Sequence, residues 1–326
     1  MAALLHDVGH APFSHASEQL FPLRKGTQSR YKHEHYAAEI VRTHFKHIIE
    51  EHSINTTDRF RAEDVVSLLE GTEDAGRALL WRPLIVGQMD ADRIDYLLRD
   101  SLHAGVDYGR FDWRRLVNTA EVVPGEEGGA PRLGVSEGGW HAAEGLILAR
   151  YFMFTQVYFH RTRVAFDLHL REALKEMLPE GVFPPPEGGG LDEYLRWEDW
   201  RVLGRLTERK GGKHGDRLAN RNHYREVEHT PETPTPADLQ KLERWREALG
   251  DLLAAEEKAE NSWYTLGPTD IPVLSETEPR EVSPLSEYSN VVKNIKPIRK
   301  VLLYVRREDY GKARQRLKKV KGEKND

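Results

Sequence analysis

Histidines and a carboxylate are concentrated at the N-terminal end of the chain. His6 and Asp7 are adjacent, and His10, His15 and His33 bring the group to five residues within 28 positions. Imidazole and carboxylate together are suitable ligands for a divalent ion such as Mn, Fe, Zn or Mg. Because such an ion lowers the pKa of a bound water and offsets phosphate charge, the pattern predicts a hydrolytic metal centre. Chance clustering of surface histidines is the alternative.

A second pair of residues in this segment is suited to proton transfer. His15 and Glu18 are three positions apart, so their side chains can meet on one helical turn. A carboxylate beside an imidazole raises the pKa of the imidazole and fixes its orientation. The pair therefore predicts a general acid for a departing alkoxide, although taken alone it is more typical of a surface ion pair.

Carboxylates recur between residues 90 and 100. Four of them alternate with basic residues in this order: Asp90, Asp92, Arg93, Asp95, Arg99 and Asp100. On a helix, Asp92, Tyr96 and Asp100 are spaced four apart and form one polar stripe. The apolar residues between them indicate that one side of the helix is buried, and a buried carboxylate needs a partner such as a metal ion. A wholly solvated stripe is the alternative.

A long apolar and aromatic segment carries the third group. Arg150, Tyr158 and His160 lie on it, followed by Arg161 and Arg163. The planar guanidinium of arginine matches phosphate oxygens well. An aromatic core helix with basic outer residues explains most of this pattern, so spacing alone predicts no site here.

Composition limits the class of protein. The chain has 326 residues, a net charge of −5 and no cysteine. The lack of cysteine excludes disulfides and thiolate metal sites and agrees with a reducing cytoplasm, where we expect the protein to act. The net charge gives no general attraction to nucleic acid, and no apolar run has the length of a membrane span. Neither nucleic acid nor membrane is therefore an indicated partner.

The elements that must position these groups are mainly helical. Apolar spacing predicts helices over 2–8, 15–20, 32–52, 62–81, 84–102 and 139–177. Turn residues between two short apolar runs predict a hairpin within 119–137. The fold class is therefore mainly α, a helical bundle with a small hairpin, followed by an α+β region.

The Pro- and Gly-rich segment 183–190 predicts a domain boundary, with one domain over 1–182 and another over 183–326. In the second domain the sequence predicts helices over 192–207, 236–258 and 308–320 and a strand over 300–305. The polar segment 208–235 is predicted to be a mobile loop.

Two of the motifs resemble one known family. Residues 3–15 read Ala-Leu-Leu-His-Asp-Val-Gly-His-Ala-Pro-Phe-Ser-His and resemble the HD motif of the deoxynucleoside triphosphate triphosphohydrolases. This family includes bacterial dGTPases and the animal SAM-and-HD-domain enzyme. Residues 90–100 resemble its second motif, and Arg150 with the Tyr158-Phe159-His160 triplet matches its substrate-binding helix. The resemblance extends from residue 1 to about 180 and is looser beyond.

The resemblance implies a role for each matched residue. It implies that His6, Asp7 and Asp92 bind the metal ion and that His15 and Glu18 form the catalytic dyad. The positions that match contacts to the phosphates or the sugar are His10, His33, Arg93, Tyr96, Asp100, Arg150, Tyr158 and His160. A tyrosine beneath a deoxyribose would leave no room for a 2′-hydroxyl, so a dNTP is the implied substrate. Members of the family commonly form dimers or tetramers, which implies a homo-oligomer.

The family's metal centre has a fourth ligand, a histidine on a helix a few dozen residues upstream of the HD pair. The sequence that begins at Met1 has no counterpart, so we expect the natural coding sequence to start earlier. A shortened, catalytically impaired protein that binds nucleotides for regulation is one alternative. Hydrolysis of another nucleotide or phosphoester is a second, because the HD scaffold serves many esters.

Overall fold

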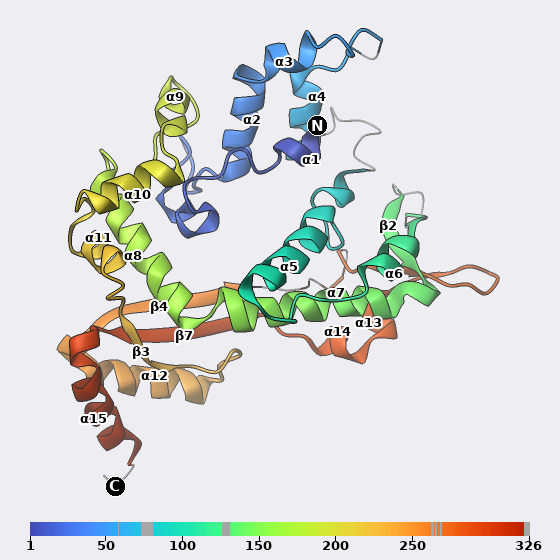
Figure 1. Ribbon diagram of the computed structural model, residues 1–326. Coiled ribbons are helices and arrows are strands. Elements are labelled where there is room, and N and C mark those ends of the chain that lie inside the picture. The colour runs from blue at the N-terminus through green and yellow to red at the C-terminus, as the bar shows by residue number, and fades with distance from the viewer. Residues whose placement is uncertain are drawn as a thin grey trace. The chain divides into compact units, whose positions relative to one another are not determined.

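A computed structural model describes residues 1–57, 59–72, 81–125, 131–261, 264, 266–267 and 269–322. The chain separates into two compact units. Figure 1 shows the chain coloured by residue number, from blue at the N-terminus to red at the C-terminus. The first unit comprises Met1–Arg82 and Ala165–His223, and the second comprises Pro83–Val164 and Tyr224–Asp326. This division does not coincide with the boundary predicted at 183–190. Contacts decide it: Phe183 is buried within the first unit, so the Pro- and Gly-rich segment is part of that unit's packing.

The first unit is helical. Its helices are α1 (Ala2–Leu5), α2 (His33–Thr43), α3 (Lys46–Glu50), α4 (Ala62–Glu70), most of α8 (Arg161–Met177), α9 (Gly190–Leu195), α10 (Asp199–Thr207) and α11 (Gly212–Ala219). Aromatic rings form the centre of its core. The ring centroids of Phe21 and Tyr36 are 4.7 Å apart, and those of Tyr36 and Tyr194 are 4.1 Å apart. Such buried pairs add about 0.5–1.5 kcal/mol each beyond the burial of their area.

The second unit combines helices with two small sheets. Its helices are α5 (Ala91–Ala104), α6 (Trp113–Asn118), α7 (Trp140–Met153), α12 (Pro236–Leu249), α13 (Leu285–Tyr288), α14 (Asn290–Asn294) and α15 (Tyr310–Lys321). One sheet has the order β1-β2-β5-β6, with β1 (Ala120–Val123), β2 (Arg132–Ser136), β5 (Pro272–Leu274) and β6 (Val282–Pro284). Its β2–β5 pair is parallel and its other pairs are antiparallel.

The other sheet is antiparallel, with the order β3-β7-β4, where β3 is Arg225–His229, β7 is Ile298–Val305 and β4 is Leu253–Asn261. In Figure 1, α12 lies along this sheet and α15 lies near its end. Apolar side chains of these two helices, including Leu242 and Leu317, pack with Val301 and Leu303 of β7. Alternate residues of β7 point to the same face, which explains why Val301 and Leu303 share one core.

Several predictions from the sequence are confirmed. The fold is mainly α with a C-terminal α+β region, and β1 and β2 form the predicted hairpin, whose residues 126–130 lie outside the described part. The predicted strand at 300–305 is β7, and the predicted helix at 308–320 is α15. None of the helices in the described residues is long and apolar enough to cross a membrane.

Two helices that were predicted as continuous are interrupted. The segment 32–52 forms α2 and α3, with two residues between them. The segment 139–177 forms α7 and α8, separated by a π-helical turn over Phe154–Tyr158. A π-helical turn contains one residue more than an α-helical turn, and the apolar spacing on either side of it is unchanged. Periodicity alone therefore does not reveal such a turn.

Other helix ends also differ from the prediction. The helix predicted from residue 84 begins at Ala91, because the side chain of Asp90 caps it by accepting a hydrogen bond from the Arg93 amide. The remaining N-terminal segments are shorter, with α1 over Ala2–Leu5, 3-10 turns over Ser14–Ala16 and Glu18–Leu20, and α4 over Ala62–Glu70. Residues 73–80 of the predicted helix 62–81 lie outside the described part.

The C-terminal half is more regular than predicted. The segment 208–235 contains α11 and β3, so the predicted mobile loop is wrong. The predicted helix 192–207 forms α9 and α10. The predicted helix 236–258 ends with α12, because Gly250 adopts a φ of 48° and the chain then enters β4. Positive φ values end a right-handed helix, and glycine adopts them without a side-chain clash.

Candidate functional site

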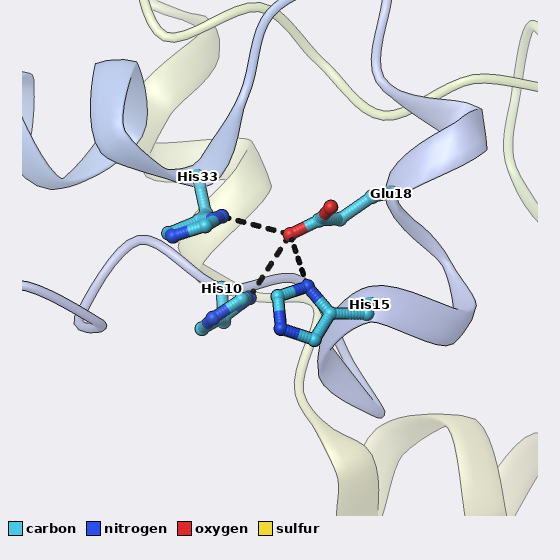
Figure 2. Close-up of side chains that lie close together, drawn as sticks. All are labelled: His10, His15, Glu18 and His33. Atoms are coloured by element: carbon cyan, nitrogen blue, oxygen red, sulfur yellow. Dashed lines mark hydrogen bonds and ion pairs between the residues drawn. The ribbon is translucent and has the colours of Figure 1, made fainter. Parts of the chain in front are cut away.

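Three histidines surround one carboxylate oxygen in the first unit (Figure 2). The oxygen is Oε1 of Glu18, and the Nδ1 atoms of His33, His15 and His10 lie 2.8, 3.0 and 3.3 Å from it. The rings of His10 and His33 are stacked, with centroids 3.9 Å apart. The ring of His15 meets that of His10 edge-on at 4.8 Å. We call these four residues the Glu18 group.

The charges of the Glu18 group favour an ionised carboxylate. Burial opposes ionisation of Glu18, but its contacts with the three histidines outweigh burial and hold the pKa of Glu18 far below its usual range. Burial also opposes protonation of His10, yet hydrogen bonds to Asp7 and Glu18 raise the pKa of His10 to about 9. His15 is the member that faces solvent, with 70% of its side chain exposed against 14% for His10. The group therefore combines an ionised carboxylate with one imidazole that a substrate can reach.

The His6–Asp7 pair lies beside this group. Oδ1 of Asp7 is 3.3 Å from Nε2 of His6 and 3.5 Å from Nε2 of His10. Nδ1 of His6 lies 2.8 Å from the carbonyl oxygen of Ala3, which can only accept, so Nδ1 carries the proton. The pKa of the Asp7 carboxylate is lowered, because a hydrogen bond with His10 and the charges of His6, His10 and His33 outweigh the opposing effect of burial. An imidazole nitrogen and a carboxylate oxygen this close together are ligand types that fit a divalent cation.

Close backbone packing positions the Glu18 group. A Cβ atom at Gly9 would lie 2.1 Å from the carbonyl oxygen of His33 and 2.3 Å from the amide nitrogen of Ala37. Only glycine therefore allows the segment after the HD pair to lie against α2, which carries His33. The hydroxyl of Tyr194 donates to the carbonyl of Gly9 at 2.7 Å from α9.

The turn that carries His15 is strained. Phe13 and Ser14 both have positive φ values, 60° and 52°, in the left-handed region that costs non-glycine residues of order 1–3 kcal/mol each. Two contacts hold it. The amide of Phe13 donates to Oδ1 of Asp199 at 2.9 Å, and the buried hydroxyl of Ser17 donates to the carbonyl of Pro12 at 2.5 Å.

A second polar group lies in the second unit, between α5 and the π-helical turn. The hydroxyl of Tyr158 donates to Oδ2 of Asp100 at 2.6 Å. Burial and this hydrogen bond raise the pKa of Tyr158, so it stays a neutral phenol. The Tyr96 ring is 6.3 Å from that of Tyr158, and Tyr96 also forms a side-chain hydrogen bond with Arg150. We call Tyr96, Asp100, Arg150 and Tyr158 the Tyr158 group.

Other acidic residues of α5 have structural roles. Asp90 is buried and accepts hydrogen bonds from the amides of Gly87 and Arg93 at 2.9 and 2.7 Å. The guanidinium of Arg93 donates to the Gly87 carbonyl, which ties it to the same turn. Asp95, which lies outside the stripe of Asp92, Tyr96 and Asp100, forms an exposed ion pair with Arg99 at 2.9 Å.

The predicted site residues thus fall into two sets. His6, Asp7 and the Glu18 group belong to the first unit, whereas Asp92, Arg93 and the Tyr158 group belong to the second. The metal role of His6, Asp7 and Asp92 stays a prediction. His160 is exposed and its Nδ1 accepts from the Thr162 amide at 3.3 Å, so its contact with a substrate also stays a prediction.

Two residues that hold the site could not be predicted from the sequence. Tyr194 and Asp199 contact the segment around Gly9 and Phe13 from more than 180 positions away along the chain. A tyrosine and an aspartate in a helical segment give no local signal of such a role. Only contacts between distant parts of the chain reveal it.

Comparisons with known proteins assign both regions. A model of the HD domain matches residues 1–100, and a model of the HD-associated region matches residues 111–302. A crystal structure of a hypothetical protein from Aquifex aeolicus is 30% identical, with a TM-score of 0.77, over 97% of this chain and 78% of that one.

Curated relatives match the N-terminal part. An uncharacterized protein of Methanocaldococcus jannaschii is 34% identical over 178 residues, which are 54% of this chain and 33% of that protein. The deoxynucleoside triphosphate triphosphohydrolase SAMHD1 homolog of Dictyostelium discoideum is 29% identical over 126 residues, or 38% of this chain and 23% of that one. The chain therefore spans about a third or less of the length of these two relatives.

Proposed function

This chain belongs to the family of proteins in which an HD domain is followed by an HD-associated region, and from that premise we propose that it is a metal-dependent nucleotide phosphohydrolase. Its proposed reaction is hydrolysis of a deoxynucleoside triphosphate to a deoxynucleoside and inorganic triphosphate. The similarity to the Dictyostelium triphosphohydrolase supports this choice of substrate. The observation that carries the proposal is the Glu18 group, which combines an ionised carboxylate with an exposed imidazole.

The proposed reaction forms one bond and breaks another at the α-phosphorus. The oxygen of water bonds to the phosphorus, and the bond to the 5′-oxygen of the sugar breaks. The water loses one proton, and the departing 5′-oxygen gains one. His15 is the proposed donor of that proton, because it is exposed and its Nδ1 is 3.0 Å from Oε1 of Glu18, which orients the ring.

The proposed metal ligands are His6, Asp7 and Asp92. The ion, when bound, would lower the pKa of a water molecule and offset charge on phosphate oxygens. Asp7 is suited to this role because its pKa is lowered, so the carboxylate is available at neutral pH.

The Tyr158 group is proposed to bind the sugar and the phosphates. Tyr158 is held by Asp100, so its ring can support a deoxyribose in one fixed place. Arg150, beside Tyr96, supplies a guanidinium suited to phosphate oxygens. His10, His33 and Arg93 are the other proposed phosphate contacts, together with His160. We also propose that the protein forms a homo-oligomer, which light scattering of the purified chain can test.

Product analysis tests the reaction. The purified chain is incubated with Mn²⁺ and each of the four dNTPs, and the products are separated by anion-exchange chromatography. We expect triphosphate and deoxynucleoside from at least one dNTP. No triphosphate from any dNTP, with metal bound to the protein, would contradict the proposal. Orthophosphate released from another phosphoester would favour the second activity, and thermal stabilisation by dNTPs without turnover would favour a regulatory role.

A matched pair of variants tests the metal ligand on α5. Asp92→Asn should abolish Mn²⁺-dependent triphosphate release, because an amide is a poor ligand for the ion. Asp95→Asn removes an exposed carboxylate of the same helix, paired only at the surface with Arg99, and should leave the rate unchanged. Equal rates for the two variants would exclude Asp92 as a ligand.

A further inference from the structure

Glu18 Oε1 has more imidazole neighbours than it can accept hydrogen bonds from. The Nδ1 atoms of His10, His15 and His33 all face this single oxygen, at 3.3, 3.0 and 2.8 Å. A carboxylate oxygen offers two lone-pair directions, so it cannot accept three N–H donors with good geometry. At least one of the three Nδ1 atoms therefore cannot donate a good hydrogen bond to this oxygen. A cation among the four atoms would give each of them a partner.

We propose that the Glu18 group is a second metal site, which binds a zinc-like divalent transition-metal ion. Imidazole nitrogen and carboxylate oxygen are both zinc ligands, and four such atoms fill the tetrahedral shell of the ion. Its bond lengths of about 2.0–2.2 Å place neighbouring ligand atoms about 3.4 Å apart. The four residues offer ligand atoms that all lie within 4.8 Å of one another. The three N–O separations, 2.8–3.3 Å, are already close to the required value. Small side-chain rotations would therefore complete the site.

The ligand chemistry separates this site from the proposed catalytic centre. One imidazole and two carboxylates, from His6, Asp7 and Asp92, suit harder ions such as Mn²⁺ or Mg²⁺. Three imidazoles suit Zn²⁺, Co²⁺ or Ni²⁺. Access is open on one side, because 70% of the His15 side chain is exposed. The side chains of His10 and His33 are only 14% and 16% exposed, and they form the walls.

Occupancy of this site has a consequence that rests on the proposed function. An ion bound to Nδ1 of His15 excludes the imidazolium form, which is the form that releases a proton near neutral pH. Excess Zn²⁺ should therefore inhibit triphosphate release at a constant concentration of Mn²⁺. Because protons compete for the same nitrogen atoms, zinc should also bind more weakly as the pH falls.

Cobalt is the probe for the site, because tetrahedral Co²⁺ absorbs visible light far more strongly than octahedral Co²⁺. The metal-free full chain is titrated with Co²⁺ alone. We expect an intense visible band in the wild-type protein, and His15→Gln and His33→Gln should weaken the affinity at least about tenfold. His47→Gln removes an exposed histidine of the same unit outside the group and should leave the band unchanged. Because His15 is exposed, its variant should fold, which circular dichroism checks.

Two further results separate this site from the proposed catalytic centre. Asp92→Asn should keep the cobalt band while it loses Mn²⁺-dependent activity. A band that is unaffected by both His15→Gln and His33→Gln, or that disappears in Asp92→Asn, would overturn the second site. A band that depends on His15 and His33 supports the site whether or not the chain releases triphosphate, so the two proposals fail separately.

Discussion

The polar groups of the two units hold a carboxylate in different ways. In the Glu18 group the carboxylate contacts three imidazoles, side chains that can carry a proton or bind a metal ion. In the Tyr158 group the carboxylate of Asp100 contacts a phenol whose pKa is raised, so the hydroxyl keeps its proton. The first arrangement can move protons or bind a cation, and the second can only fix a ring in place. Catalysis and positioning are therefore expected to be separable by mutation.

Glu18→Gln should have the largest effect on activity. It removes the negative charge that orients the three imidazoles and helps to raise the pKa of His10, so kcat should fall by about a hundredfold or more. Steady-state kinetics with the preferred dNTP measure it. Glu34→Gln is the matched control, because its carboxylate is 3.6 Å from His33 and 47% exposed. An unchanged kcat in Glu18→Gln would contradict a role of the Glu18 group in proton transfer.

Gly9→Ala should lower the free energy of unfolding of the first unit. The added Cβ would meet the backbone of α2 at 2.1 Å, an overlap that typically costs about 1–3 kcal/mol or more. Chemical denaturation measures the free energy of unfolding. Gly204→Ala in α10 is the control, because a Cβ there meets nothing within 4 Å and alanine favours a helix by about 1 kcal/mol. Equal stabilities of the two variants would mean that Gly9 does not position the Glu18 group.

Tyr158→Phe should weaken binding without changing the choice of sugar. It leaves the Asp100 carboxylate without its phenolic donor, which costs about 1–2 kcal/mol in stability or substrate binding. The ring remains, so the preference for deoxyribonucleotides should persist, whereas Tyr158→Ala should reduce it. The ratio of kcat/KM for a dNTP and the matching ribonucleotide tests this. A preference lost in Tyr158→Phe would show that the hydroxyl, and not the ring, selects the sugar.

The smallest expected effect concerns pH and a buried pair, His169 and His214, in the first unit. Their Nδ1 atoms are 2.8 Å apart, and burial with the charge of His214 lowers the pKa of His169 to about 3. Because the unfolded chain binds this proton near pH 6.5 and the folded chain does not, stability should fall as the pH drops from about 6.5 towards 3. His169→Gln should flatten that part of the profile, measured by denaturation at several pH values. An unchanged slope would show that His169 is protonated in the folded protein.

Much of the fold was predictable because its signals are local. The helices follow apolar spacing, the hairpin follows turn residues between short apolar runs, and β7 and α15 follow the same rules. The interruptions were not predictable in this way. The π-helical turn over Phe154–Tyr158 lies within an unbroken apolar pattern, and its place depends on packing around it. The ordered segment at 208–235 is polar, so only its contacts reveal α11 and β3.

The sequence by itself determined which chemistry is present. His6, Asp7, His10, His15 and Glu18 lie within 13 positions, so their types and order are visible without a structure. Only the tertiary structure decided how they meet. It turns three Nδ1 atoms towards one oxygen of Glu18, because Gly9 lets the chain lie against α2 and Tyr194 and Asp199 hold it from distant helices. Side-chain direction depends on such long-range packing, which no local pattern of residues encodes.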